Sequence, residues 1–135
     1  MATQIFVNLP IQDLPRSVAF FTALGFRFDP RFTNDQATCM IVGENIFVML
    51  LTQPFFQGFT DKPVSDAHQS TEVLVCLSRE SRADVDEIVR RAAAAGGKVP
   101  RPVQDLGFMY QHGFEDPDGH LWEVMFMEPD AVPPL

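Results

Sequence analysis

Glu123 has the setting that most suggests a chemical role in this sequence of 135 residues. It follows an Asp-Pro-Asp-Gly sequence at residues 116–119, whose residue types are typical of a tight turn. The residues after the turn alternate as in a strand, and Glu123 shares its face with apolar neighbours, namely Leu121, Met125 and Met127. Removing a carboxylate from water is costly unless it is paired, bound to a metal or neutralised. We therefore expect Glu123 to have a partner or a catalytic function.

Glu72 repeats this pattern in an earlier candidate strand (residues 71–77), where it shares a face with Leu74 and Cys76. Because Glu72 is near the start of that strand, one interpretation is that it lies exposed and solvated. The other is that both glutamates face one cavity, where their repulsion and desolvation raise the pKa of at least one of them. One carboxylate is then a general base, or the pair receives a cationic or hydroxyl-rich ligand. Glu123 and Glu72 are thus our candidate catalytic residues.

Three other polar side chains are candidates for ligand binding. Asn8 shares a face with Phe6 on the first predicted strand, which places its amide beside a ligand; the alternative is a local bond to the backbone. Tyr110 and His112 share a face with Phe114, where they are expected to form an aromatic wall with polar tips. For His112 the alternative is an ordinary surface histidine, or one whose hydrogen bonds are satisfied within the protein. His120, in the turn before the last strand, is expected to be exposed.

The first half of the chain predicts a strand, a helix and three more strands. Asp13 is suited to cap the helix, with proline tolerated in the first turn, and Gly25 stands where a helix ends. The strands are expected at residues 5–9, 26–28, 38–42 and 45–51. Gly43 and Glu44 are expected to form the turn of a hairpin between the last two strands.

The second half predicts the same order of elements. Ser81 with Asp84 indicates the start of a helix, whose apolar stripe stops at Gly96 and Gly97. The strands are expected at residues 71–77, 98–100, 108–114 and 121–127. We therefore predict an α+β fold of two tandem β-α-β-β-β modules, at about residues 3–53 and 71–128, within a single domain spanning residues 1–135.

The connection at about residues 54–70 is long for a compact domain, which favours a functional or partly helical segment. It contains Phe55, Phe56 and Phe59, followed by a polar stretch. Two interpretations are equally supported by the sequence. The three rings form a lid over a cleft, or they close one end of the core.

Composition excludes several classes of protein. The net charge of −8 and the scattered basic residues argue against nucleic-acid binding. No apolar run is long enough for a membrane span, and no signal peptide is recognisable at the start. Cys39 and Cys76 lie in apolar runs, so we expect two buried free thiols and a reducing cytoplasmic location.

The duplicated module resembles the vicinal oxygen chelate superfamily, which includes glyoxalase I, bleomycin- and fosfomycin-resistance proteins and extradiol dioxygenases. One motif that carries the resemblance is Asp-Leu-Pro-Arg-Ser-Val-Ala-Phe-Phe-Thr-Ala-Leu-Gly-Phe at residues 13–26. The other is Phe-Glu-Asp-Pro-Asp-Gly-His-Leu-Trp-Glu at residues 114–123. The resemblance covers nearly the whole chain and implies mixed sheets curled around a cleft. It specifies the fold better than the reaction, because this scaffold carries many chemistries.

The resemblance also implies four positions for ligands of a divalent metal. By their offset from the motifs these positions fall on Phe6, Met49, Glu72 and Glu123. Members of the family that bind a metal have His, Gln or Glu there, whereas two of the four residues in this chain are apolar. Zn, Ni, Fe or Mn needs about three nitrogen or oxygen ligands. We therefore expect no tightly bound catalytic metal, and only Glu72 and Glu123 as its ligands if one is present.

The expected function is that of a glyoxalase-like protein that binds a small organic molecule in its cleft. Glu72, Glu123 and Asn8 would supply polar groups, and Phe6, Met49 and Tyr110 apolar walls. The reaction that suits these groups is isomerase or lyase chemistry with a carboxylate assisting proton transfer. The alternatives are a non-catalytic drug- or metabolite-sequestering binder of the bleomycin-resistance type and a metal-dependent lyase or dioxygenase. The resemblance further implies a homodimer.

Overall fold

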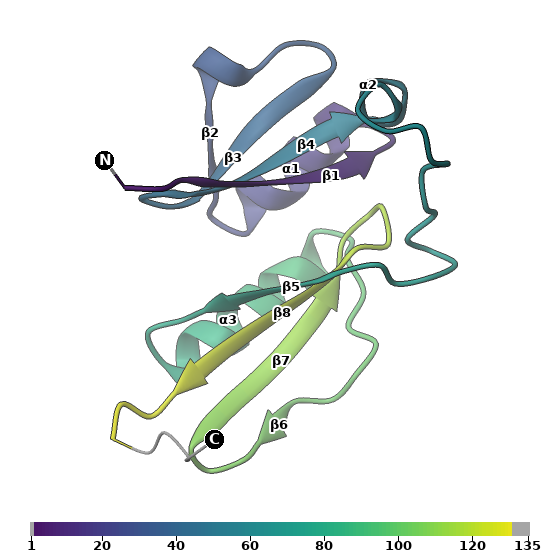
Figure 1. Cartoon of the computed structure of the whole chain (residues 1–135). Helices are drawn as coiled ribbons and strands as arrows, with labels where there is room; N and C mark the ends of the chain where they lie inside the picture. The colour runs from purple at the N-terminus through teal and green to yellow at the C-terminus, as the bar shows by residue number, and fades with distance from the viewer. Residues whose placement is uncertain (1, 131–135) are drawn as a thin grey trace. The chain divides into compact units, whose positions relative to one another are not determined.

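The computed structural model describes residues 2–130 of the chain. The chain divides between Asp66 and Ala67 into two compact units, and each has its own four-stranded sheet. Both units have the order strand, helix, strand, strand, strand, which confirms the predicted α+β duplication (Figure 1).

The first unit is built on a sheet with the strand order β1-β4-β3-β2. β1 runs parallel to β4, whereas β3 is antiparallel to both of its neighbours. The elements are β1 (Ile5–Ile11), α1 (Leu14–Ala23), β2 (Arg27–Asp29), the short 3-10 helix η1 (Pro30–Phe32), β3 (Ala37–Gly43), β4 (Ile46–Thr52) and α2 (Gln53–Gln57). A parallel pair needs a crossover between its strands, and α1 lies in that crossover.

Helix α1 begins and ends where the sequence predicts. The carboxylate of Asp13 accepts a hydrogen bond from the backbone N–H of Arg16 at 3.1 Å, which satisfies one of the free donors at the helix start. Gly25 follows the helix with φ of 103°, a conformation that glycine adopts without steric cost. The apolar side of α1 is buried against one face of the sheet, where the buried residues include Leu9, Ile11, Val48 and Leu50.

The second unit repeats this sheet with the order β5-β8-β7-β6. β5 is parallel to β8, and β7 is antiparallel to both β8 and β6. Its elements are β5 (Leu74–Ser78), α3 (Arg82–Ala94), β6 (Gln104–Asp105), β7 (Met109–Glu115) and β8 (Leu121–Met127). The hydroxyl of Ser81 caps α3 by accepting from the N–H of Asp84 at 3.1 Å, as predicted.

Helix α3 covers one face of the second sheet. Its buried side consists of Val85, Ile88, Val89 and Ala92. The sheet residues that are most deeply buried on the helix side are Phe114, Trp122 and Val124, and the rings of Phe114 and Trp122 stack with centroids 6.3 Å apart. We call the face turned away from a unit's own helix its open face.

Several local predictions were wrong. The β3–β4 hairpin turns at Glu44 and Asn45, one residue later than expected, because Gly43 still pairs with Ile46. β5 begins at Leu74 rather than residue 71, since its partner β8 begins only at Leu121, the residue paired with Leu74. Residues 98–100 form a single bridge, from Lys98 to Glu115, and β6 lies further along the chain.

Two predictions of exposure were also wrong. Cys39 is a buried free thiol, but Cys76 is an exposed one, because it points to the open face of an edge strand. His120 was expected to be exposed in its turn, yet it is only 9% exposed.

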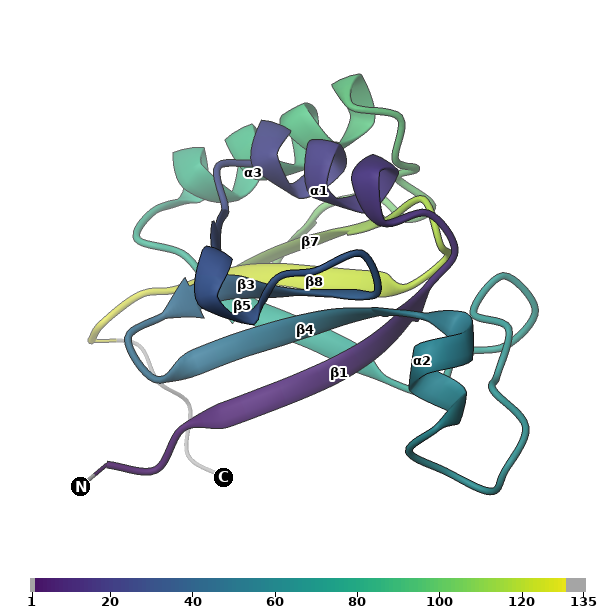
Figure 2. The same cartoon turned by 90° about the horizontal axis from the view of Figure 1, so that it is seen from above.

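The connection after β4 is partly helical, as one interpretation of its length predicted. Figure 2 shows α2 directly at the end of β4. The rings of Phe55 and Phe59 meet edge to face with centroids 5.2 Å apart, and Phe59 is 71% exposed. No helix within residues 2–130 has the length and apolar character needed to cross a membrane.

Candidate functional site

The turn before β8 fixes where that strand starts. The buried carboxylate of Asp116 accepts hydrogen bonds from the backbone N–H of Asp118 (2.9 Å), the backbone N–H of His120 (3.0 Å) and the indole Nε1 of Trp122 (2.9 Å). Burial raises the pKa of Asp116, whereas the charge of His120 and the hydrogen bonds from the Trp122 indole and the His120 N–H oppose that shift. The turn and the first residues of β8 are therefore locked together.

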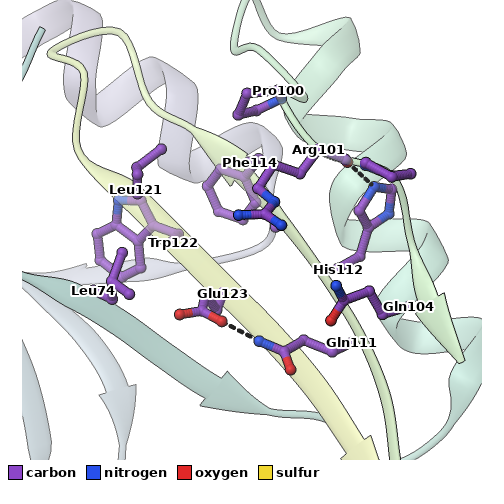
Figure 3. Close-up of a pocket in the computed structure, with 12 residues that line it drawn as sticks. Leu74, Pro100, Arg101, Gln104, Gln111, His112, Phe114, Leu121, Trp122 and Glu123 are labelled. Carbon is purple, nitrogen blue, oxygen red and sulfur yellow. Dashed lines mark hydrogen bonds between the residues drawn. The ribbon is translucent and has the colours of Figure 1, made fainter. Parts of the chain in front are cut away.

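Glu123 lies on the open face of the second sheet, two residues after the anchored start of β8. Trp122 and Val124 point to α3, so the alternation of the strand sends Glu123 the other way, as predicted. The side chain is half-buried, and the amide Nε2 of Gln111 donates a hydrogen bond to its carboxylate (Figure 3). Glu123 therefore has a neutral hydrogen-bond donor as its partner rather than a second charge.

The strands on either side of Glu123 bring a thiol and a glycine beside it. Its register partner on β5 is Cys76, and its partner on β7 is Gly113. A Cβ atom at residue 113 would lie only 2.7 Å from the backbone oxygen of Trp122. Glycine at this position therefore permits the close approach of β7 and β8 next to the carboxylate.

A pocket of about 300 Å³ opens beside Glu123 and Gln111. Leu74 and Leu121 contribute apolar surface, while Gln104 and Arg101 add polar groups from β6 and the loop before it. Every residue that lines the pocket belongs to the second unit. The combination of a mostly apolar surface with a few polar groups is typical of small-molecule sites.

His112 also lines the pocket, although alternation along β7 places it on the same face as Tyr110 and Phe114. Its ring is engaged with the loop before β6. Its Nε2 atom lies 3.0 Å from the backbone oxygen of Arg101, so the tautomer with Nε2–H donates a hydrogen bond to that carbonyl (Figure 3). The contact joins β7 to the segment that carries Arg101. His112 thus holds the rim of the pocket in place.

Tyr110 lies away from this pocket. It alternates with Gln111 and therefore points to the helix side of β7, where its hydroxyl donates to the carboxylate of Asp86 on α3 at 2.6 Å. That hydrogen bond raises the pKa of the Tyr110 hydroxyl. The structure therefore does not place Tyr110 beside Glu123, although the sequence analysis expected both residues in one ligand-binding cleft.

Glu72 lies outside the strand in which the sequence placed it. It is exposed and precedes the first residue of β5 by two positions. The residue of β5 that lies beside Glu123 is Cys76 instead. The second unit therefore presents one carboxylate, not a pair, at the centre of its open face.

The predicted residues of the first unit lie on the open face of their own sheet. Asn8 is the register partner of Met49, and Phe6 is the partner of Phe47, whose ring it stacks on with centroids 4.9 Å apart. The amide of Asn8 is exposed and makes the local contact that was the alternative interpretation, a bond of 3.4 Å to the backbone oxygen of Phe6. Phe6, Asn8 and Met49 thus form a mostly apolar surface.

The four positions that the resemblance assigns to a metal do not fit one. Phe6 has no donor atom, the thioether of Met49 is a poor ligand for a hard cation, and Glu72 is outside its strand. Within either unit, across residues 2–130, no three His, Cys, Asp or Glu side chains gather closely enough to hold a metal ion. Only Glu72 and Glu123 of the four have a ligating carboxylate, and two carboxylates fall short of the roughly three ligands of a catalytic site.

Three polar residues of the pocket were not recognised from the sequence, namely Arg101, Gln104 and Gln111. Gln111 was recognisable in principle, because it alternates with Tyr110 and belongs to the strand that pairs with the one carrying Glu123. Arg101 and Gln104 follow no periodic pattern, and their position depends on how the loop after α3 returns to the sheet.

The whole-chain comparisons agree with this architecture. A sequence profile of the Glyoxalase/Bleomycin resistance protein/Dioxygenase superfamily matches residues 4–124. The chain therefore belongs to the glyoxalase/bleomycin resistance protein/dioxygenase superfamily. A search of curated proteins gave no match.

Solved structures show the same fold. A hypothetical protein from S. aureus is 26% identical, with a TM-score of 0.79 over 93% of this chain and 94% of that one. TioX from a Micromonospora species is 28% identical, with a TM-score of 0.64 over 94% of this chain and 100% of TioX. The fosfomycin resistance protein FosX from Mesorhizobium loti is 15% identical, with a TM-score of 0.68 over 96% and 95% of the two chains, a likeness of fold alone.

Proposed function

We propose that this protein binds a small organic molecule in the pocket beside Glu123 and Gln111 of its second unit. The observation that carries the proposal is the position of Glu123, a half-buried carboxylate in a pocket of about 300 Å³, held by the amide of Gln111. Membership of a superfamily whose members commonly bind small molecules supports it. Glu72 is exposed outside β5, so the proposal does not use it.

Glu123 is also the group in the pocket that suits proton transfer. A carboxylate held in place by a neutral donor can take a proton from carbon next to a carbonyl group and return it elsewhere on the same molecule. Gln111 orients the carboxylate without neutralising it. The reaction class that we propose is therefore isomerisation or elimination of a small carbonyl compound, with Glu123 as the base.

A pair of matched variants tests this role. Glu123→Gln keeps the size of the side chain but removes the base, so turnover should fall by about a hundredfold or more, the range of general acid–base catalysis. Binding of neutral ligands should survive. Glu80→Gln removes an exposed carboxylate outside the pocket and should change neither property. Equal activity of the two variants would exclude Glu123 as the base.

The second candidate is a binder without catalysis, of the bleomycin-resistance type. The pocket contains one carboxylate, Glu123, and the partner of that carboxylate is the neutral amide of Gln111. The absence of an acid–base pair among these lining residues favours binding without catalysis. One neighbour by fold is named a fosfomycin resistance protein. A thermal-shift screen with bleomycin, fosfomycin and a library of small metabolites separates the candidates, because any ligand of the native state raises its melting temperature. Ligands that are never turned over would favour the binder.

A divalent-metal enzyme is the third possibility that the family allows. The mismatch at Phe6 and Met49 argues against it. Elemental analysis of protein purified without a chelating resin should find Zn, Ni, Fe and Mn well below one atom per chain. A near-stoichiometric content of one of them would contradict our proposal.

We further propose that the two units act as one domain and that the chain forms a homodimer, as the family resemblance implies. Light scattering on the intact chain tests the second point, and a monomer at micromolar concentration would contradict it. We also propose a cytoplasmic location. The exposed free thiol of Cys76 supports it, because thiols persist in reducing compartments.

A further inference from the structure

We propose that the pocket selects small organic acids that carry a hydrogen-bond donor, such as 2-hydroxy acids. This inference rests on the proposed binding function and names the class of ligand. It is carried by two oppositely charged side chains that line the same pocket, Arg101 and Glu123. Arg101 and Glu123 form no ion pair with each other in the described part of the chain, so each charge remains available to a ligand.

Arg101 supplies the end of the pocket that receives an anion. Figure 3 shows its side chain extending over the pocket from the loop before β6. Within residues 2–130 its guanidinium makes no hydrogen bond or ion pair, although the chain as a whole is acidic with a net charge of −8. Guanidinium groups match carboxylates with two parallel hydrogen bonds. An unpaired guanidinium in the pocket of an acidic protein therefore favours an anionic ligand.

Glu123 supplies the other end, which receives a donor. Its carboxylate accepts one hydrogen bond from Gln111, and an ionised carboxylate has room for several more. A ligand that brings a hydroxyl or ammonium group satisfies this capacity, whereas a second carboxylate at this end is repelled. The two ends together thus distinguish a hydroxy acid from a dicarboxylic acid.

The rest of the pocket lining is mostly apolar, and the pocket is small. Leu74 and Leu121 line it together with the side-chain amides of Gln104 and Gln111. A volume of about 300 Å³ is at the lower limit for ligand sites. The pocket therefore suits a short hydrocarbon body rather than a large drug.

His112 is a positioning residue for the anion end. Its ring binds the backbone oxygen of Arg101 at 3.0 Å and so fixes the point from which the guanidinium reaches over the pocket. His112→Gln keeps a side-chain N–H that can donate to this carbonyl, whereas His112→Leu does not. Loss of acid preference in the leucine variant and its retention in the glutamine variant would distinguish positioning from mere packing.

The test uses matched sets of ligands with the intact protein. Each set contains a 2-hydroxy acid from lactate to phenyllactate, the same acid without its hydroxyl group, and the neutral amide of the hydroxy acid. Isothermal titration calorimetry and NMR shifts of the Gln111 side-chain amide measure binding. We expect the hydroxy acid to bind at least about tenfold more tightly than its amide, the effect of one charge-assisted contact.

Variants then assign each end. Arg101→Gln should remove the preference for acid over amide, and Glu123→Gln should reduce the preference for the hydroxyl group. Arg27→Gln, which removes an exposed positive charge from the first unit, should change neither. Neutral amides that bind as tightly as acids would overturn this inference and leave the proposed binding function intact. Absence of binding by every acid, amide and library compound would contradict the binding function itself.

Discussion

Cys76 of β5 lies directly beside Glu123 of β8, as its partner in the register of the parallel pair. The thiol is exposed, and the negative charge of the glutamate acts on it. The carboxylate at the centre of the open face therefore has a chemically addressable neighbour one strand away.

Selective labelling of Cys76 follows from this arrangement. Two effects raise the pKa of the Cys76 thiol: partial desolvation, which is the larger, and the negative charge of Glu123. Burial also raises the pKa of Cys39. Since a raised pKa leaves less thiolate at neutral pH, labelling by a thiol reagent should be slow there and should accelerate as the pH rises. The exposed Cys76 should react well before the buried Cys39.

Glu123→Gln should lower the pKa of Cys76 and so increase its labelling rate at neutral pH. Mass spectrometry of the labelled peptides follows both cysteines at once, with Cys39 as the internal control. An unchanged rate in the variant would show that the charge of Glu123 does not reach the thiol.

Alanine at residue 113 should destabilise the second sheet. The added Cβ would meet the backbone oxygen of Trp122 at 2.7 Å, so β7 or β8 must shift. Overpacking of this kind costs about 1–3 kcal/mol, and we expect a loss of this size in urea unfolding. Gly43→Ala is the control, because its Cβ would meet Ile46 at an ordinary contact distance of 3.5 Å. Equal stability of the two variants would contradict the close approach.

Asp116→Ala should strongly destabilise the turn before β8. The substitution removes the acceptor of three N–H groups, and each buried group left without a partner costs about 1–3 kcal/mol. Asp116→Asn keeps one carbonyl oxygen and should lose less. Trp122 is the single tryptophan of the chain, and its indole binds Asp116, so its fluorescence reports the loss directly.

Acid should weaken the ion pairs on α3. Hydrogen bonds from Arg90 and Arg91 lower the pKa of Glu87 from 4.5 to about 2. Because the folded state has the lower pKa, the stabilisation is present above the unfolded value and is lost as the pH falls through the folded value. An NMR titration of the Glu87 carboxyl should therefore have its midpoint near 2. A midpoint near 4.5 would show that these pairs do not persist in solution.

Local signals in the sequence were sufficient to predict most of the fold. The caps at Asp13 and Ser81 and the glycine after each helix were correct, since each depends on a few neighbouring residues. Alternation along β8 correctly separated Trp122 from Glu123. The repeat of the module correctly predicted the order of the elements along both halves of the chain.

The candidate site was less predictable, because it depends on pairing between distant strands. Alternation assigns a face to each residue but does not tell which residue of a neighbouring strand lies beside it. The register brings Cys76 to Glu123 and leaves Glu72 outside the strand, and the loop after α3 brings Arg101 to the pocket. His120 was misjudged because turns are usually exposed, whereas this one is folded back onto Asp116.

The position of β8 has a consequence for how the second unit is assembled. β8 is the last strand of its unit within residues 2–130, yet in the sheet it lies between β5 and β7. β5 therefore has no strand to pair with until residues after the turn at Asp116 have been synthesised. The hairpin of β7 and β8 has the shorter loop to close and should form first, with β5 joining later. A ribosome that stalls before Leu121 would thus hold a chain with an unpaired apolar strand, which is a natural target for chaperones.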